Sequence, residues 1–167
     1  HVPFGHFGEA VLNQISLENG EGYFHHNVES VRVLMELERG GEGCNLTLQV
    51  LDAIMCHNVE FALGEYHPKK KSKEEFLEEY ENSYKEKGVL LKMHPMTLEG
   101  CVVRVSDLIA YLGRDIDDAV RLKILSREEI PENIAKVLGT TTKEIVNTCI
   151  LDIINNSYDK NYIKLSD

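Results

Sequence analysis

The chain has 167 residues, and its 28 acidic side chains outnumber 18 basic ones to give a formal net charge of −10 at neutral pH. This length, with 43% hydrophobic residues, is sufficient for one domain with its own core. The acidic balance argues against a general nucleic-acid scaffold, because such a protein needs a basic surface to displace counterions from phosphates. An anionic substrate must therefore be bound locally, by a metal ion or by a few basic residues.

The cysteines and the hydrophobic runs exclude further classes. The four cysteines lie far apart and form no CxxC pair, so we expect neither a zinc cluster nor a disulfide framework. No apolar run approaches the roughly 20 residues that a membrane span needs, and the first residues lack the basic and apolar regions of a signal peptide. We therefore expect a cytoplasmic protein with no membrane partner.

Apolar periodicity predicts helices and no alternating strand pattern, so the expected fold class is all-α. In the first part of the chain, helices are predicted over 9–17, 27–39 and 46–63. Asn45 is a plausible N-cap for the third of these helices. The apolar stripe of that third helix is expected to consist of Leu46, Val50, Ile54 and Phe61.

Three more helices are predicted over 101–125, 130–139 and 140–158. The first of them contains one internal glycine, Gly113, while Gly139 ends the second and a threonine among 140–142 is expected to cap the third. Between the two halves of the chain, the composition shifts to an almost wholly charged stretch. We interpret about 64–94 as a charged helical insertion whose few apolar residues rest on the body of the protein. The alternative is that its lysines attract a polyanionic substrate.

The opening sequence HVPFGHFGE is the first of three clusters of polar groups. If this stretch is helical, His6 and Glu9 share a face, so the carboxylate can orient the imidazole and raise its basicity. The alternative is a histidine-rich surface segment without a catalytic role.

The second cluster is YFHHNVESVR, with His25 and His26 at the start of a helix. The helix dipole disfavours a charged imidazole there, which suits either a partner of a metal-bridged water or a general base. The alternative is that one histidine caps the helix while the other is exposed. His57, in the following helix, is either a partly buried structural histidine or a catalytic one.

The third cluster consists of Asp107, Tyr111 and Asp115, which fall at i, i+4 and i+8 on one helix face within an apolar run. A carboxylate in that setting needs a metal ion or a buried cation, because its unpaired desolvation is costly. Two arginines nearby, Arg104 and Arg121, are expected either to bind phosphates or to form ion pairs with neighbouring acidic side chains. A separate i, i+4 pair, Arg114 and Asp118, has the spacing of a surface salt bridge, and Asp117 has no evident role.

Taken in order, these stretches resemble one family. HVPFGHFGE, FHHNVESVR with NLTLQVLDAI after it, EGCVVRVSDLIAYLGRDIDDAVR and VNTCILDIINNSYDKNYI are similar to the deoxyguanosinetriphosphate triphosphohydrolase group of HD-domain phosphohydrolases. The resemblance covers nearly the whole chain outside the charged insertion and implies an HD-domain helical bundle. It also implies that 1–167 is a partial HD domain, without the N- and C-terminal parts of the family domain.

The resemblance implies a set of site residues. The family metal is held by a first histidine, an adjacent His-Asp pair and a distant aspartate that matches Asp107, so the other three ligands are expected upstream of this chain. His6, backed by Glu9, matches the histidine beside the scissile α-phosphate, and His26 matches a second catalytic histidine. The resemblance places three further residues against the substrate, of which the last two approach the sugar: His1, Tyr111 and Asp115.

The implied activity is hydrolysis of a deoxynucleoside triphosphate, of the dGTP kind, at the α-phosphorus to give a deoxynucleoside and tripolyphosphate. The implied cofactor is a divalent ion, Mg, Mn or Fe, and the implied assembly is a homo-oligomer, commonly a hexamer. A nucleotide effector and single-stranded nucleic acid stay open as further partners. Two other interpretations stay open: another HD-domain nucleotide phosphohydrolase, such as a nucleotidase or phosphodiesterase, and a non-catalytic nucleotide-binding regulatory subunit.

Overall fold

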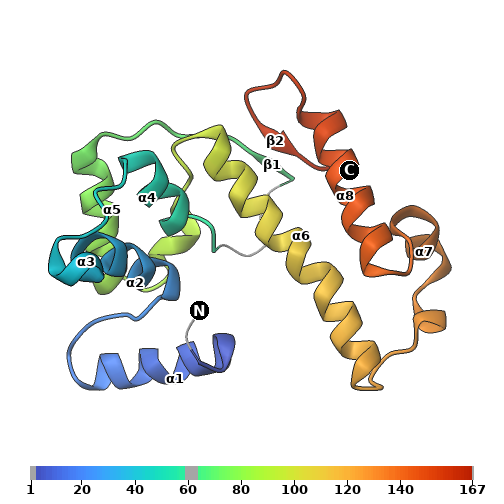
Figure 1. The fold of residues 1–167 in the computed structure, drawn as a ribbon, viewed down its shortest axis with the longest axis horizontal. Helices are drawn as coiled ribbons and strands as arrows, with labels where there is room; N and C mark the ends of the chain where they lie inside the picture. Colours follow the sequence, from blue (N-terminus) through green and yellow to red (C-terminus); the bar gives the residue numbers. More distant parts are fainter. Residues whose placement is uncertain (1–2, 59–63, 167) are drawn as a thin grey trace.

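The computed structural model describes residues 3–58 and 64–166, and helices dominate it (Figure 1). The α-helices are α1 (Gly5–Glu18), α2 (His26–Arg32), α3 (Glu38–Gly41), α4 (Leu48–Met55), α5 (Lys73–Lys85), α6 (Leu98–Arg121), α7 (Glu132–Leu138) and α8 (Thr142–Ser157). Shorter elements are a π-helical turn, Val33–Leu37, and two 3₁₀ turns, Val89–Lys92 and Arg127–Glu129. Strands β1 (Glu65–Tyr66) and β2 (Ile163–Lys164) pair antiparallel. The predicted all-α class is confirmed, with this small sheet added.

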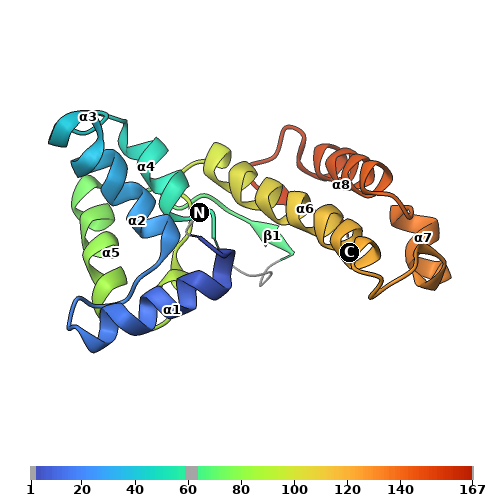
Figure 2. The ribbon, with the colours of Figure 1, turned by 60° about the horizontal axis from the view of Figure 1, so that its bottom comes forward.

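The helices form two groups that α6 connects. Helices α2 to α5 lie together at one end of the molecule, and α7 and α8 lie at the other (Figures 1 and 2). Helix α6 runs between them and contacts α4 on one side and α8 on the other. Helix α1 lies along the edge of the first group (Figure 2). None of the helices in the described part of the chain is both long and apolar enough to cross a membrane.

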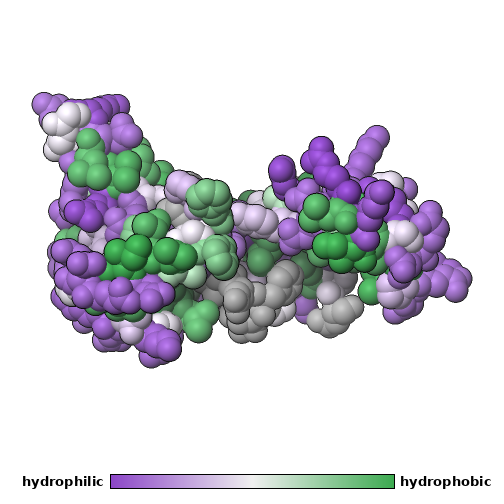
Figure 3. All heavy atoms as spheres, turned by 90° about the horizontal axis from the view of Figure 1, so that it is seen from below, coloured by the Kyte–Doolittle hydropathy of each residue, from purple (hydrophilic) through white to green (hydrophobic). Residues whose placement is uncertain are grey.

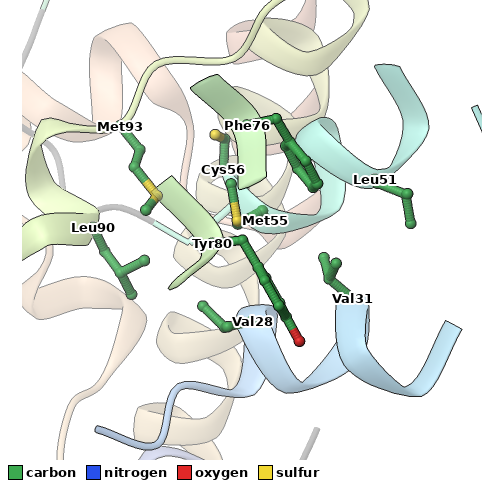
Figure 4. Close-up of a cluster of buried hydrophobic side chains, with 9 residues drawn as sticks. All are labelled: Val28, Val31, Leu51, Met55, Cys56, Phe76, Tyr80, Leu90 and Met93. Carbon is green, nitrogen blue, oxygen red and sulfur yellow. The ribbon is translucent and has the colours of Figure 1, made fainter. Parts of the chain in front are cut away.

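The first group encloses a core to which α2, α4 and α5 contribute side chains that point toward one another (Figure 4). Its buried members are Val28, Val31, Leu51, Met55, Cys56, Phe76, Tyr80, Leu90 and Met93. Phe76 and Tyr80 come from the charged stretch and are only 1% and 6% exposed. The prediction that the few apolar residues of that stretch rest on the body of the protein is therefore confirmed for these two.

The third predicted helix is shorter than expected. Helix α4 begins after Thr47, whose backbone is extended, while Asn45 has a left-handed backbone with φ of 50°. The prediction that Asn45 caps this helix is therefore wrong. The predicted apolar stripe is also wrong, because Val50 is 44% exposed, whereas Leu51 and Met55 are buried. Phe61, the last residue of that stripe, lies outside the described residues.

A buried ion network ties the charged stretch to α4. The ammonium Nζ of Lys71 donates to Asp52 Oδ1 at 2.7 Å and to Glu79 Oε2 at 2.5 Å, and the side chains of Lys71 and Asp52 are each only 1% exposed. Burial opposes the charge of Lys71, but the neighbouring Cys56, Asp52 and Glu79 raise its pKa overall. Asp52 Oδ2 also accepts from the backbone N–H of Met96. The network therefore joins α4, α5 and the segment before α6.

The second core lies between α6, α8 and the small sheet. Its buried members are Tyr66, Cys101, Val105, Ile109, Ile145, Cys149 and Ile163. Helix α8 begins with the predicted threonine cap, since the side chain of Thr141 accepts from the N–H of Glu144 and the Glu144 carboxylate accepts from the N–H of Thr141.

Asp117 has a clear structural role that its sequence context did not indicate. Its carboxylate accepts hydrogen bonds from the Thr142 hydroxyl and from Arg127, so it joins α6 to the start of α8. These hydrogen bonds, from Thr142 first and then Arg127, hold the pKa of Asp117 below its usual value. The neighbouring pair predicted as a surface salt bridge, Arg114 and Asp118, lies 3.8 Å apart with both side chains exposed.

Arg104 differs from its predicted roles. The side chain is buried, donates from Nη1 to the backbone carbonyl of Met93 at 3.1 Å, and lies over the ring of Tyr66 at 5.3 Å from its centroid. Burial lowers the pKa of Arg104. It therefore joins the two cores and does not face a phosphate site, whereas Arg121 lies exposed at the end of α6.

Gly113 lets α6 and α8 approach closely, since a Cβ at this position would lie 2.8 Å from Thr142 Cγ2 and 3.2 Å from Val146 Cγ2. The β-branched side chains on α8 have little freedom to move away. We expect Gly113→Ala to lower the free energy of unfolding by about 1–3 kcal/mol, although alanine favours a helix by about 1 kcal/mol. Urea unfolding measures the change. Ser106→Ala, at an exposed position of the same helix, should be neutral or slightly stabilising, and equal stability of both variants would contradict the expectation.

Candidate active site

The inner face of α1 is polar, which is unusual for a helix on a protein surface. The half-buried residues Glu9, Asn13 and Ser16 face the segment 22–26, while α1 contributes no buried residue to either core. Asn13 Oδ1 accepts from the N–H of Phe24, and the Ser16 hydroxyl donates to the carbonyl of Gly22. Spacing at i, i+4 and i+7 places these three polar groups on one stripe. The stripe fixes α1 where its first turn reaches the start of α2.

Glu9 supports His26. One carboxylate oxygen accepts from the backbone N–H of His26 at 2.9 Å, and both oxygens lie 2.9–3.0 Å from His26 Nδ1. The side chains of His26 and Glu9 are only 5% and 13% exposed, so solvent screens this pair weakly. The carboxylate also supplies an acceptor at the N-terminus of α2, where the preceding residue makes no side-chain cap.

This pairing was not indicated by the spacing of the sequence, which suggests that Glu9 orients His6. Glu9 reaches His26 because its stripe of α1 packs on the segment that leads into α2. A carboxylate only accepts hydrogen bonds, so Nδ1 of His26 carries the hydrogen, and Nε2 is the basic nitrogen of the neutral ring.

The ring of His6 lies close to the ring of His26 and to the ring of Tyr111. The ring centroids of His6 and His26 are 5.8 Å apart, and those of His6 and Tyr111 are 6.3 Å apart. The structure therefore brings together residues from α1, α2 and α6 that are far apart in the sequence. Burial, with the negative charges of Asp107 and Asp115, raises the pKa of Tyr111, so its phenol stays protonated at neutral pH.

A group of ligand-type atoms lies at the same place. The candidate ligand atoms of His6, Glu9 and His26 are within 4.8 Å of one another, and no other such group of three occurs in residues 3–58 and 64–166. Two imidazoles and a carboxylate form a donor set that suits a divalent first-row metal. In this structure the Glu9 carboxylate is already hydrogen-bonded to His26, which equally suits a proton-transfer pair.

The remaining predicted site residues are placed as follows. Asp107 is half-buried on α6, one turn before Tyr111, and Asp115 is exposed one turn after it. The three share one helix face, but the apolar burial expected around the carboxylates does not extend to Asp115. Asp107 is not part of the group of ligand-type atoms around His26. His1 lies outside the described residues.

The sequence left the role of His57 open and gave no signal for Asn58, and both lie close to His26. The ring of His57 lies 5.4 Å from that of His26, edge-on at 70°, and Asn58 Nδ2 is 3.5 Å from His26 Nδ1. His57 follows α4, and its Nδ1 is 2.6 Å from the carbonyl of Ile54 in the last turn of that helix. Its position in the site depends on where α4 ends, and the sequence pattern predicted a longer helix.

His25 fits neither predicted role, since it makes no side-chain cap and is half-buried. Its ring stacks on that of Tyr23 at 6.2 Å, and its buried Nε2 has no hydrogen-bond partner among the described residues. Burial lowers the pKa of His25 despite the opposing charge of Glu9. Burial therefore favours the neutral imidazole at physiological pH.

Comparison with known proteins finds relatives that share one name. The chain is 36% identical over its whole length to the deoxyguanosinetriphosphate triphosphohydrolase-like protein of Desulfatibacillum aliphaticivorans, of which it covers 41%. Proteins of the same name from Caldanaerobacter subterraneus subsp. tengcongensis and Clostridium perfringens are 35% and 37% identical over 99% and 95% of the chain. The chain is a homologue of these deoxyguanosinetriphosphate triphosphohydrolase-like proteins.

The homology confirms the family resemblance expected from the ordered motifs. The chain spans about two-fifths of the length of these triphosphohydrolase-like relatives, namely 41%, 38% and 37%. No protein-family model matches the chain, and no solved structure matches it.

Proposed function

We propose that the protein is a metal-dependent hydrolase of deoxynucleoside triphosphates, of the dGTP kind, which cleaves at the α-phosphorus to release the deoxynucleoside and tripolyphosphate. The observation that carries the proposal is the Glu9–His26 pair, which faces His6 and Tyr111. Its family context comes from relatives that are named triphosphohydrolase-like. The protein would act as a homo-oligomer in the cytoplasm.

The Glu9–His26 pair suits proton transfer at a phosphate ester. Because Nδ1 of His26 is held by the carboxylate, Nε2 can take a proton from an attacking water or give one to a leaving oxygen. Glu9 stabilises the imidazolium that forms, and the low exposure of both side chains strengthens this charge interaction. His6 is the more exposed imidazole and its ring lies 6.3 Å from that of Tyr111, so we assign it to the substrate side of the pair.

Tyr111 and Asp115 would contact the sugar. A phenol ring packed on the ribose leaves no room for a 2′-hydroxyl, so the selection of deoxynucleotides would be steric. The exposed fraction of Tyr111, 36%, leaves ring surface for such a contact, and the phenol hydrogen is retained because its pKa is raised.

The donor set fits a divalent ion, Mg, Mn or Fe, at a carboxylate and imidazole site. Asp107 would be its ligand on α6, one turn before Tyr111, whose ring lies 6.3 Å from that of His6. A bound ion would polarise the phosphoryl oxygen and lower the pKa of a bound water. The described residues around Asp107 provide only part of such a site.

The test is an analysis of products. Each deoxynucleoside triphosphate is incubated with the full-length protein and Mn²⁺, and the products are separated by anion exchange. Deoxynucleoside and tripolyphosphate in equal amounts are expected, and EDTA should abolish their formation. Monophosphate with pyrophosphate would contradict the proposal and favour another HD-domain phosphohydrolase. Tight binding without turnover would favour a regulatory nucleotide-binding subunit.

A further inference from the structure

The C-terminal end of α4 is bound by two side chains, one of which, His57, belongs to the candidate active site. The last carbonyls of an α-helix have no partner within the helix. Here His57 Nδ1 lies 2.6 Å from the carbonyl of Ile54, and Asn27 of α2 donates from Nδ2 to the carbonyl of Met55. A carbonyl only accepts, so Nδ1 of His57 must carry the hydrogen. The ring of His57 is thereby attached to a helix that contributes to the first core.

This anchored ring contacts His26 on a side that Glu9 does not hold. Glu9 holds the Nδ1 corner of the His26 imidazole. The ring of His57 packs edge-on against that of His26, with centroids 5.4 Å apart and planes at 70°. Such an edge-to-face arrangement of aromatic rings is a favourable one.

We propose that His57 is a positioning residue, which holds the imidazole of His26 in the orientation needed for proton transfer. Its anchor is the Ile54 carbonyl and its contact surface is its ring. The inference deepens the proposed function and rests on it for the kinetic part of its test only. A residue that merely completes the end of α4 would need the hydrogen-bond donor but not the ring.

Three substitutions in the full-length protein separate the ring from the donor. His57→Ala removes both, His57→Asn keeps a donor in the place of Nδ1, and His57→Phe keeps an aromatic ring. We expect kcat for dGTP hydrolysis to fall about 10–100-fold in the Ala and Asn variants, as for other residues that orient an active-site histidine. In His57→Phe, which keeps the ring but not its bond to the Ile54 carbonyl, kcat should fall less than in the Ala and Asn variants, and KM should change less than about 3-fold throughout.

His67→Ala is the matched control, because this exposed histidine also has a polar partner, Glu65, and should leave kcat unchanged. Thermal unfolding shows whether each variant is folded at the assay temperature. A kcat for His57→Asn equal to that of the wild type would overturn the inference, since it would show that only the donor matters. A kcat for His57→Phe as low as that of His57→Ala would overturn it too.

Crystal structures of the wild type and of His57→Ala test the inference without activity. We expect the His26 ring of the variant to occupy more than one orientation, with its bond to Glu9 partly lost. A single, unchanged orientation would contradict the positioning role. If the wild-type protein hydrolyses no deoxynucleoside triphosphate, the proposed function fails, while the crystal structures still decide the role of His57.

Discussion

Replacing Glu9 with glutamine is expected to lower kcat about 100- to 10,000-fold, the range that general acid–base catalysis usually contributes. Glutamine has the same size, but its amide supplies one accepting oxygen where the carboxylate offers two to the backbone and the ring of His26. It also removes the negative charge that stabilises the imidazolium. Since the imidazolium forms only during the reaction, KM should change little. Steady-state hydrolysis of dGTP by the full-length protein measures both constants.

The same substitution at Glu18 is the matched control. Glu18 lies on the same helix and accepts a hydrogen bond from Gln14 on the exposed surface, far from His26. Glu18→Gln should therefore keep the kcat of the wild type. A kcat for Glu9→Gln within about 3-fold of that value would show that proton transfer does not depend on the pair.

Replacing Lys71 with methionine is expected to lower the free energy of unfolding by about 3–5 kcal/mol, the usual cost of removing one partner of a buried ion pair. Methionine fills most of the volume of the lysine stem but leaves the Asp52 carboxylate, whose side chain is 1% exposed, without its cation. Glu79 loses the same partner but is 26% exposed, so water can replace part of that interaction. Urea unfolding followed by circular dichroism measures the loss.

Two further variants show whether the buried charge is responsible. Lys85→Met breaks an exposed i, i+4 pair with Glu81 at 3.3 Å and should cost at most about 0.5 kcal/mol. The double variant Lys71→Met with Asp52→Asn removes both charges and should lose less than the sum of the single changes. Additive losses would contradict the interpretation.

The pH dependence of the same network has a defined sign. The pKa of Lys71 is raised in the folded protein, so the network contributes fully below the pKa of an unfolded lysine, about 10.4. The contribution is lost as pH rises through the higher folded value. The difference in stability between wild type and Lys71→Met should therefore narrow only in strongly alkaline solution.

Local signals predicted much of the fold. The apolar periodicity of α6 and α8 and the threonine cap of α8 are properties of adjacent residues, and the structure confirms them. The end of α4 was not predictable, because the apolar pattern continues past Met55 while the helix stops there. The buried network of Lys71 was hidden in a run of charges typical of a solvated surface. Its partner Asp52 lies 19 residues earlier, so no local pattern links them.

The candidate site was predicted by residue type more than by arrangement. The motifs indicated His6, Glu9, His26 and Tyr111, and the structure brings these residues together. Motif spacing could not show that Glu9 supports His26, because that contact spans 17 residues and depends on how α1 packs. The role of His57 could not be predicted either, since it follows from the position where α4 ends.

The polar inner face of α1 has a consequence for ligand binding. The apolar residues of this helix point outward, with Phe4 and Phe7 89% and 79% exposed, and apolar side chains gather where α1 lies in the view from below (Figure 3). Among the described residues, hydrogen bonds of Glu9, Asn13 and Ser16 attach this helix to segment 22–26, so we expect its docking equilibrium to depend on these bonds more than on the two cores. A ligand that contacts both His6 and Tyr111 binds only the docked population. Its apparent dissociation constant equals the intrinsic one divided by the docked fraction.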